Sequence, residues 1–259
     1  MTDFSTIDNL PRPNERRIAL RVTPAAERAI RSGHPWLFAD SIREQSKDGR
    51  AGDLAVVFDR KRRFLAVGLY DPHAPIRMRV LQQGQPATID QDWFWRQLRA
   101  AIARRADLAA DPATTGYRLV HGENDGLPGL VVDRYAETLV LKLYTAAWIP
   151  HLRSVVAALL DLQQAKRLVL RLSRAVADLP EACCGLTDGQ VLLGERLIVM
   201  APRPGRIHKE YRLPFADLGV DADLREVKKH PEFGPRREEI LNMIWDMEEE
   251  IMGGKEDAA

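Results

Sequence analysis

The side chains best suited to chemistry lie in and beside the stretch GENDGLPGLVVDRY, residues 122–135. His121, Glu123, Asp125 and Asp133 offer the nitrogen and carboxylate groups that a metal site or an acid–base pair uses. The same stretch carries Asn, Asp, Gly and Pro at the spacing of two turns, followed by an apolar run typical of a strand. Turn capping and solvated strand ends explain the four polar side chains more simply. We therefore expect a scaffold here, without a catalytic group.

A run of four cations at residues 60–63 is the second candidate site. Such a run can neutralise phosphates, and an imidazole and an indole earlier in the chain add a hydrogen bond and a stacking face. A solvated hairpin tip and a core tryptophan are the alternative interpretations of the same residues. The RNA-binding candidates are His34, Trp36, Arg60, Lys61, Arg62 and Arg63.

Charge is distributed unevenly along the chain, although its net value is only +1. Through Gln85 there are 15 Lys and Arg residues against 10 Asp and Glu residues, whereas from Arg196 onward the counts are 11 and 14. This asymmetry favours a polyanion as the partner of the N-terminal part.

The cysteine pattern and the apolar runs exclude several protein classes. The only cysteines, Cys183 and Cys184, are adjacent, which rules out a disulfide framework and the paired spacing of a zinc site. No apolar run approaches the roughly 20 residues that cross a bilayer. The opening MTDFSTIDNL lacks the basic and apolar regions of a secretory signal. We therefore expect a cytoplasmic protein with no metal and no membrane partner.

Short strands around one small helix are expected in the N-terminal part. After a loose lead at residues 1–14, Thr23 is a plausible N-cap, Pro24 fits the first helical position and Gly33 stops the helix. The spacing of the apolar runs predicts a compact, barrel-like β domain over residues 15–85. Its expected strands are 17–22, 54–58, 64–69 and 76–81.

Residues 86–195 are expected to form an α+β domain. A helix capped by Asp90 or Asp92 is predicted to run to Leu108, and a second helix is predicted from Pro150. The pattern of elements after the first helix is strand, strand, strand, helix, strand. The predicted strands are 117–120, 130–135, 138–144 and 167–172.

The N-terminal elements resemble a known RNA-binding family. The order of strand, helix, GHPWLF, basic hairpin and DPHAPIRMRVL is similar to a PUA domain, the small pseudo-barrel of RNA-modification proteins. That family usually has a serine where Ala74 stands, so one hydroxyl is missing here. The resemblance implies a small PUA-like β pseudo-barrel with structured RNA as its partner.

GENDGLPGLVVDRY and RLVLRLSR extend the resemblance beyond the PUA-like part. Together they resemble the middle domain of class I S-adenosylmethionine-dependent 23S rRNA (cytosine-C5) methyltransferases that contain a PUA domain. The family places a Rossmann catalytic domain after this middle domain. No G-x-G-x-x-G turn occurs among the 259 residues, so we expect no cofactor in this chain, although the full-length family uses S-adenosylmethionine.

The last quarter of the chain resembles a different family. VLLGERLIVMAPRPGRI and HPEFGPRREEI are similar to the end of ATP-binding subunits of nitrate, sulfonate and taurine ABC importers. No G-x-x-x-x-G-K-[ST] phosphate loop accompanies them. We therefore expect a fusion with its joint near Val191–Glu195, and a mostly helical extension at 196–259. An apolar stripe at Ile240, Met243, Ile244, Met247 and Ile251 indicates self-association through its helix.

The favoured interpretation is an RNA-binding fragment of an rRNA methyltransferase that lacks the catalytic domain. One alternative is an rRNA methyltransferase whose catalytic domain is supplied in trans. Another is a protein that contacts an ABC transporter through its C-terminal extension.

Overall fold

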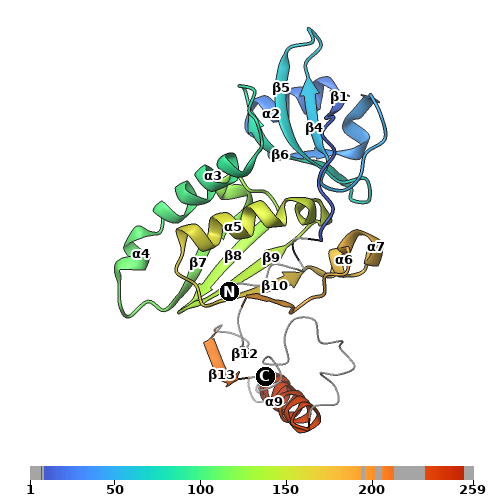
Figure 1. The fold of residues 1–259 in the computed structure, drawn as a ribbon. Helices are drawn as coiled ribbons and strands as arrows, with labels where there is room; N and C mark the ends of the chain where they lie inside the picture. The colour runs from blue at the N-terminus through green and yellow to red at the C-terminus, as the bar shows by residue number, and fades with distance from the viewer. Residues whose placement is uncertain (1–6, 8, 194–195, 202–205, 213–230, 254–259) are drawn as a thin grey trace. The chain divides into compact units, whose positions relative to one another are not determined.

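The computed structural model describes residues 7, 9–193, 196–201, 206–212 and 231–253 (Figure 1). The chain forms two compact units, residues 2–192 and residues 193–259. Half of the predicted loose lead, part of the expected joint and the PRPG turn lie outside the described residues.

Six strands form the first sheet of the larger unit. They are β1 (Ile18–Val22), β2 (Trp36–Phe38), β3 (Ile42–Gln45), β4 (Leu54–Phe58), β5 (Phe64–Tyr70) and β6 (Ile76–Gln83). Their order in the sheet is β2-β6-β5-β4-β1-β3. β1 runs parallel to β4, whereas the pairs β4–β5 and β5–β6 are antiparallel. The predicted hairpin is thus confirmed, and β3, preceded by the 3-10 turn η1 (Ala39–Ser41), is an additional strand.

The helix α2 (Pro24–Arg31) begins and ends as its caps predict. The Thr23 hydroxyl accepts a hydrogen bond from Ala26 N at 3.3 Å, which satisfies one free donor of the first turn. Ser32 follows the last helical residue, and Gly33 has a φ of +95°, a region that glycine adopts without strain. The helix and sheet enclose a core that includes Ile18, Leu20, Ile30, Leu37, Val57 and Met78.

A five-stranded sheet forms the second half of the larger unit. Its strands are β7 (Gly116–His121), β8 (Leu130–Tyr135), β9 (Thr138–Leu143), β10 (Arg167–Leu172) and β11 (Val191–Leu193), in the order β11-β10-β9-β8-β7. β7, β8 and β9 pair antiparallel, and β10 runs parallel to β9. The 3-10 helix η3 (Ala146–His151) and the helix α5 (Leu152–Leu162) make the crossover. The predicted order of strand, strand, strand, helix, strand is confirmed.

The helix predicted to reach Leu108 is interrupted. α3 (Gln91–Ala103) starts where Asp90 accepts a hydrogen bond from Trp93 N at 2.8 Å, and the short helix α4 (Ala106–Ala110) follows. Arg104 and Arg105 separate the two helices, and both side chains bind a distant carboxylate described below. Figure 1 shows α3 and α5 side by side across the sheet.

Polar contacts join the two sheets within the larger unit. The Thr145 hydroxyl donates a hydrogen bond to Asp71, and the buried His151 ring is bonded through Nε2 to Gly52 O at 2.7 Å. Gly52 has a φ of +90°, and a Cβ there would lie 2.5 Å from Pro150 Cγ. Glycine is therefore required at this close approach.

The smaller unit contains both strand and helix among its described residues. β12 (Arg196–Ala201) pairs antiparallel with β13 (Arg206–Arg212), and α9 (Phe233–Gly253) follows. Lys209 Nζ lies 2.7 Å from Glu239 Oε1 and ties the hairpin to the helix. Within the predicted apolar stripe, Ile244 is 37% exposed.

Candidate nucleic-acid interface

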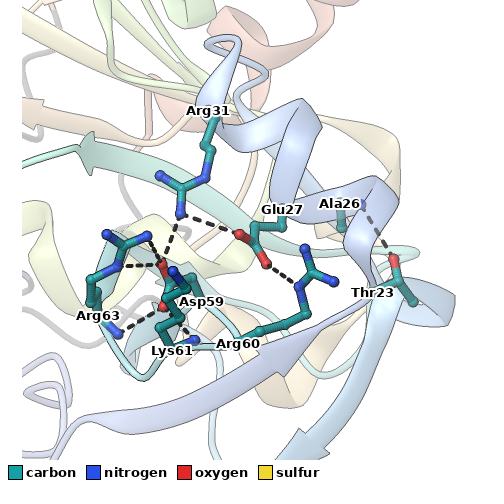
Figure 2. A network of polar contacts seen from close by, with 8 residues as sticks. All are labelled: Thr23, Ala26, Glu27, Arg31, Asp59, Arg60, Lys61 and Arg63. Atoms are coloured by element: carbon teal, nitrogen blue, oxygen red, sulfur yellow. Dashed lines mark hydrogen bonds and ion pairs between the residues drawn. The ribbon is translucent and has the colours of Figure 1, made fainter.

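One buried carboxylate organises the basic tip, which we define as residues 60–63 between β4 and β5. Asp59 Oδ1 accepts hydrogen bonds from the backbone N–H groups of Lys61 at 2.8 Å and Arg63 at 2.9 Å. Its Oδ2 accepts from Arg63 Nε and from Arg31 Nη2 of α2, each at 2.9 Å. Figure 2 shows these groups converging on Asp59. The tip is therefore an ordered turn attached to α2.

These hydrogen bonds also determine the charge of Asp59. The backbone N–H of Arg63 makes the largest contribution that lowers the pKa of this carboxyl, from 3.8 to about 2. Because the folded pKa lies below the unfolded one, the stabilisation is present above about pH 4 and is lost as pH falls through about 2. Asp59 is therefore ionised at neutral pH, where it anchors the tip.

The cations of the tip remain accessible. The side chain of Arg60 is 76% exposed and lies 3.6 Å from Glu27, and that of Arg63 is 66% exposed despite its contact with Asp59. Lys61 and Arg62 are exposed and form no ion pair within the described residues. Arg31 and the four tip cations face two carboxylates, which leaves three positive charges in excess. This surplus fits the binding of phosphates.

The two remaining predicted residues, the exposed His34 and the half-buried Trp36, belong to a group of three rings. His34, Trp36 and Phe38 form the aromatic cluster: the ring centroids of His34 and Trp36 are 5.8 Å apart, and those of Trp36 and Phe38 are 6.3 Å apart. Both pairs are T-shaped, the favourable edge-to-face geometry. Phe38 is 41% exposed. Exposed aromatic rings of this kind can stack on a nucleobase.

Phe38 is the candidate that sequence reasoning missed. Its signal was present in GHPWLF, because residues two apart on an extended chain point to the same face. His34, Trp36 and Phe38 follow that spacing, while Leu37 between them is buried.

The basic tip and the aromatic cluster flank the same helix. Arg31 in the last turn of α2 binds Asp59 beneath the tip, and the chain continues through Ser32 and Gly33 to His34. Among the residues described, no hydrogen bond, ion pair or ring contact joins the basic tip directly to the aromatic cluster. α2 and its C-terminal turn therefore connect the basic tip with the aromatic cluster.

A hydrogen bond links the aromatic cluster to the turn at residues 122–129. Trp36 Nε1 donates to Glu123 Oε1 at 3.0 Å, across 87 residues of sequence. Glu123 lies on the 3-10 turn η2 (Gly122–Asp125) and is exposed. Arg79, whose charge interacts with that of Glu123, is only 7% exposed; burial lowers the pKa of Arg79, while the charges of Asp71 and Glu123 act to raise it.

Asp125 in the same turn has a structural role. Its carboxylate accepts hydrogen bonds from Arg104 at 2.6 Å, from Arg105 at 2.8 Å and from His121 N at 2.6 Å. Burial acts to raise the pKa of Asp125, but these bonds outweigh it and the pKa is lowered. The turn is thereby fixed to the end of α3.

The remaining candidates for chemistry are also engaged in structural contacts. Asp133 pairs with Arg118 at 2.8 Å, and the buried Cys183 thiol donates to Val176 O. Within the described part of the chain no three His, Cys, Asp or Glu side chains are grouped so that they could hold a metal ion. None of the helices described there is long and apolar enough to span a membrane.

A PUA-like domain model matches residues 20–83. A ribosomal RNA large subunit methyltransferase from Deinococcus radiodurans is 52% identical over 189 residues, which cover 71% of this chain and 46% of that protein. A ribosomal RNA large subunit methyltransferase I from Shewanella frigidimarina is 37% identical over 127 residues, 49% of this chain and 32% of that protein. The chain thus spans half or less of the length of these relatives.

The taurine import ATP-binding protein TauB from Roseobacter denitrificans is 97% identical over 69 residues, 27% of this chain and 26% of that protein. TauB from Jannaschia sp. is 83% identical over a stretch of the same length. The unit boundary at Leu193 falls within the joint expected from the sequence.

Solved structures show the same fold at low sequence identity. A candidate SAM-dependent methyltransferase from Streptococcus mutans has a TM-score of 0.58 at 16% identity and covers 70% of this chain and 45% of its own. A candidate methyltransferase in complex with SAH has a TM-score of 0.55, also at 16% identity, and covers 61% of this chain and 41% of its own. The chain therefore combines a PUA-like domain, within a stretch homologous to large-subunit rRNA methyltransferases, with a segment homologous to taurine import ATP-binding proteins.

Proposed function

We propose that the PUA-like domain and the following α+β domain form an RNA-binding module that attaches to structured 23S rRNA. The observation that carries this proposal is the basic tip, in which a buried Asp59 holds consecutive exposed cations in one fixed turn. Phosphate contacts supply most of the affinity of such a surface, and the aromatic cluster adds base stacking. Homology to proteins named for large-subunit rRNA methylation supports rRNA as the partner.

Binding of S-adenosylmethionine does not fit the residues described. A class I cofactor site needs a glycine-rich turn after a parallel strand and an acidic residue for the ribose. β9 and β10 are the parallel pair of the second sheet, and the residues directly after them are Tyr144 and Ser173, with no glycine turn. We propose that methyl transfer to cytosine C5 requires residues beyond those present here.

The C-terminal segment is proposed to be the product of a fusion. The stretches homologous to the methyltransferases and to TauB account for 71% and 27% of the chain, which together is nearly all of it. No phosphate-binding loop is present in the 259 residues, so we propose no ATP hydrolysis for this segment. Self-association through α9 remains part of this proposal because Ile244 is exposed.

Salt-dependent RNA binding tests the proposal. Lys61→Gln with Arg62→Gln removes two exposed cations that hold no ion pair among the described residues, so the fold should be unaffected. If both contact phosphates, the slope of log affinity against log salt should become shallower by about 1.4–1.8. The measurement is a titration of the complete chain with a structured 23S rRNA fragment at several salt concentrations.

Arg43→Gln with Arg50→Gln is the matched control, since it removes the same charge from exposed positions outside the tip. Equal slopes for the tip variant and the wild type would exclude the tip from the interface. A comparable decrease of the salt slope in the control variant would show a general effect of net charge instead.

A further inference from the structure

We propose that the aromatic cluster and Glu123 together form a binding site for one unpaired guanine base. This inference rests on the proposed function, because it names the part of the RNA that this surface reads. It is motivated by the hydrogen bond from Trp36 Nε1 to Glu123 Oε1, which places a carboxylate beside exposed rings.

Stacking alone does not select a base. Every nucleobase has a π-face, so the exposed surfaces of Phe38 and His34 accept purines and pyrimidines alike. The T-shaped contacts with Trp36 hold the three rings in one group, and the base itself must be unpaired to reach them. Selectivity has to come from polar groups at the edge of the stacked base.

Glu123 supplies such a polar edge. An ionised carboxylate only accepts hydrogen bonds. Oε1 accepts a hydrogen bond from the indole N–H of Trp36, and within the described residues no hydrogen bond engages Oε2. Because the side chain is exposed, acceptor sites on this carboxylate stay open to a ligand.

Guanine is the base that matches two carboxylate acceptors. Its Watson–Crick edge presents N1–H and N2–H side by side, both as donors. Adenine and cytosine place one donor next to an acceptor, and uracil places one donor between two acceptors. An acceptor facing the carboxylate is repelled, so the other three bases form at most one favourable bond here.

A second indole–carboxylate contact provides an internal control. Trp95 Nε1 donates to Asp161 Oδ2 at 2.6 Å, which repeats the chemistry of Trp36 and Glu123. There the guanidinium of Arg99 lies over the Trp95 ring at 4.7 Å, and no ring pair involving Trp95 is seen among the described residues. This site therefore has the carboxylate without the stacking cluster.

The test measures the affinity of the complete chain for four RNA hairpins that differ only in one unpaired loop base, G, A, C or U. The wild type should bind the G hairpin about 10-fold more tightly than the others. Glu123→Gln replaces two acceptors by one acceptor and one donor, a pattern that matches adenine. This variant should lose the preference for G and bind the A hairpin at least as well. Asp161→Asn should retain the wild-type preference.

Two outcomes separate this inference from the proposed function. Equal binding of all four hairpins by the wild type would overturn guanine recognition while leaving RNA binding intact. Failure to bind any hairpin would instead contradict the proposed function. Phe38→Leu, at an exposed position that tolerates the change, should lower the affinity for all four hairpins to a similar extent. Unchanged affinity would overturn stacking on the aromatic cluster.

Discussion

Asp59 and Asp125 use the same chemistry for two different purposes. Each is a buried carboxylate, 2% and 4% exposed, that accepts hydrogen bonds from two arginines and from the backbone. Around Asp59 both arginine side chains are largely open to solvent, at 45% and 66% exposure. Around Asp125, Arg104 is 55% exposed, whereas Arg105 is only 15% exposed. The two clusters therefore differ in one cation: the Asp125 cluster contains a mostly buried arginine, Arg105, and the Asp59 cluster contains none.

The largest expected difference in stability between the two clusters comes from replacing their carboxylates. Asp125→Asn places an amide NH₂ group against the donors of Arg104, Arg105 or His121 N. It should lower the free energy of unfolding by about 3 kcal/mol, as expected when a buried ion pair loses one partner. Asp59→Asn should lower stability less, because the exposed tip can relax, but it should weaken RNA binding.

Urea unfolding of both variants, together with RNA titration, checks this prediction. Thr138→Ser, a small change at a buried hydroxyl that takes no part in either cluster, serves as the control for handling and expression. A larger stability loss for Asp59→Asn than for Asp125→Asn would contradict the distinction.

Removing one arginine from each cluster should give a smaller difference in stability loss between the two clusters. Arg105→Gln leaves Asp125 with one exposed arginine, Arg104, and should cost about 2 kcal/mol of stability. Arg63→Gln should cost less stability than Arg105→Gln, because the Arg63 side chain is 66% exposed and Asp59 keeps its hydrogen bonds from Arg31 and from the backbone. Unfolding curves measured in the same buffer compare the two variants. Similar losses of unfolding free energy would show that the exposure of an arginine does not govern its contribution to stability.

Acidic pH should give the smallest effect. The pKa of Asp59 is about 2, below its ordinary 3.8, so the stability difference between wild type and Asp59→Asn should stay constant from about pH 7 to about pH 5. It should shrink as pH falls from about 4 toward 2. Thermal unfolding at a series of pH values measures this, and a difference that already shrinks above pH 5 would mean that the carboxylate is not anchored as described.

Local features of the fold were predictable from the sequence. Thr23 and Pro24 mark the start of α2, and the apolar runs on both sides of the basic tip form β4 and β5 as expected. These elements depend on caps, turns and alternation between neighbouring residues, which the sequence shows directly. Phe38 was also within reach, because its spacing from Trp36 places both rings on one face.

Contacts between distant residues could not be predicted in this way. The break after α3 coincides with Arg104 and Arg105, which bind Asp125 about 20 residues away. The bond between Trp36 and Glu123 joins residues 87 positions apart. Neither has a periodic signal, since the first arises only when α3 packs against η2 and the second only when the first sheet meets the turn of the second. The role of Asp59 beneath the tip likewise depends on Arg31 from another element.

Ultraviolet cross-linking of the complete chain to a structured 23S rRNA fragment, followed by mass spectrometry of tryptic peptides, tests the central claim most directly. The peptide 32–43 contains His34, Trp36 and Phe38, and the peptide 80–96 contains Trp93 and Trp95. RNA bound at the aromatic cluster and the basic tip predicts cross-links in peptide 32–43, and their loss in the Lys61→Gln, Arg62→Gln variant at raised salt. Cross-links in peptide 80–96 with none in peptide 32–43 would contradict the proposed interface.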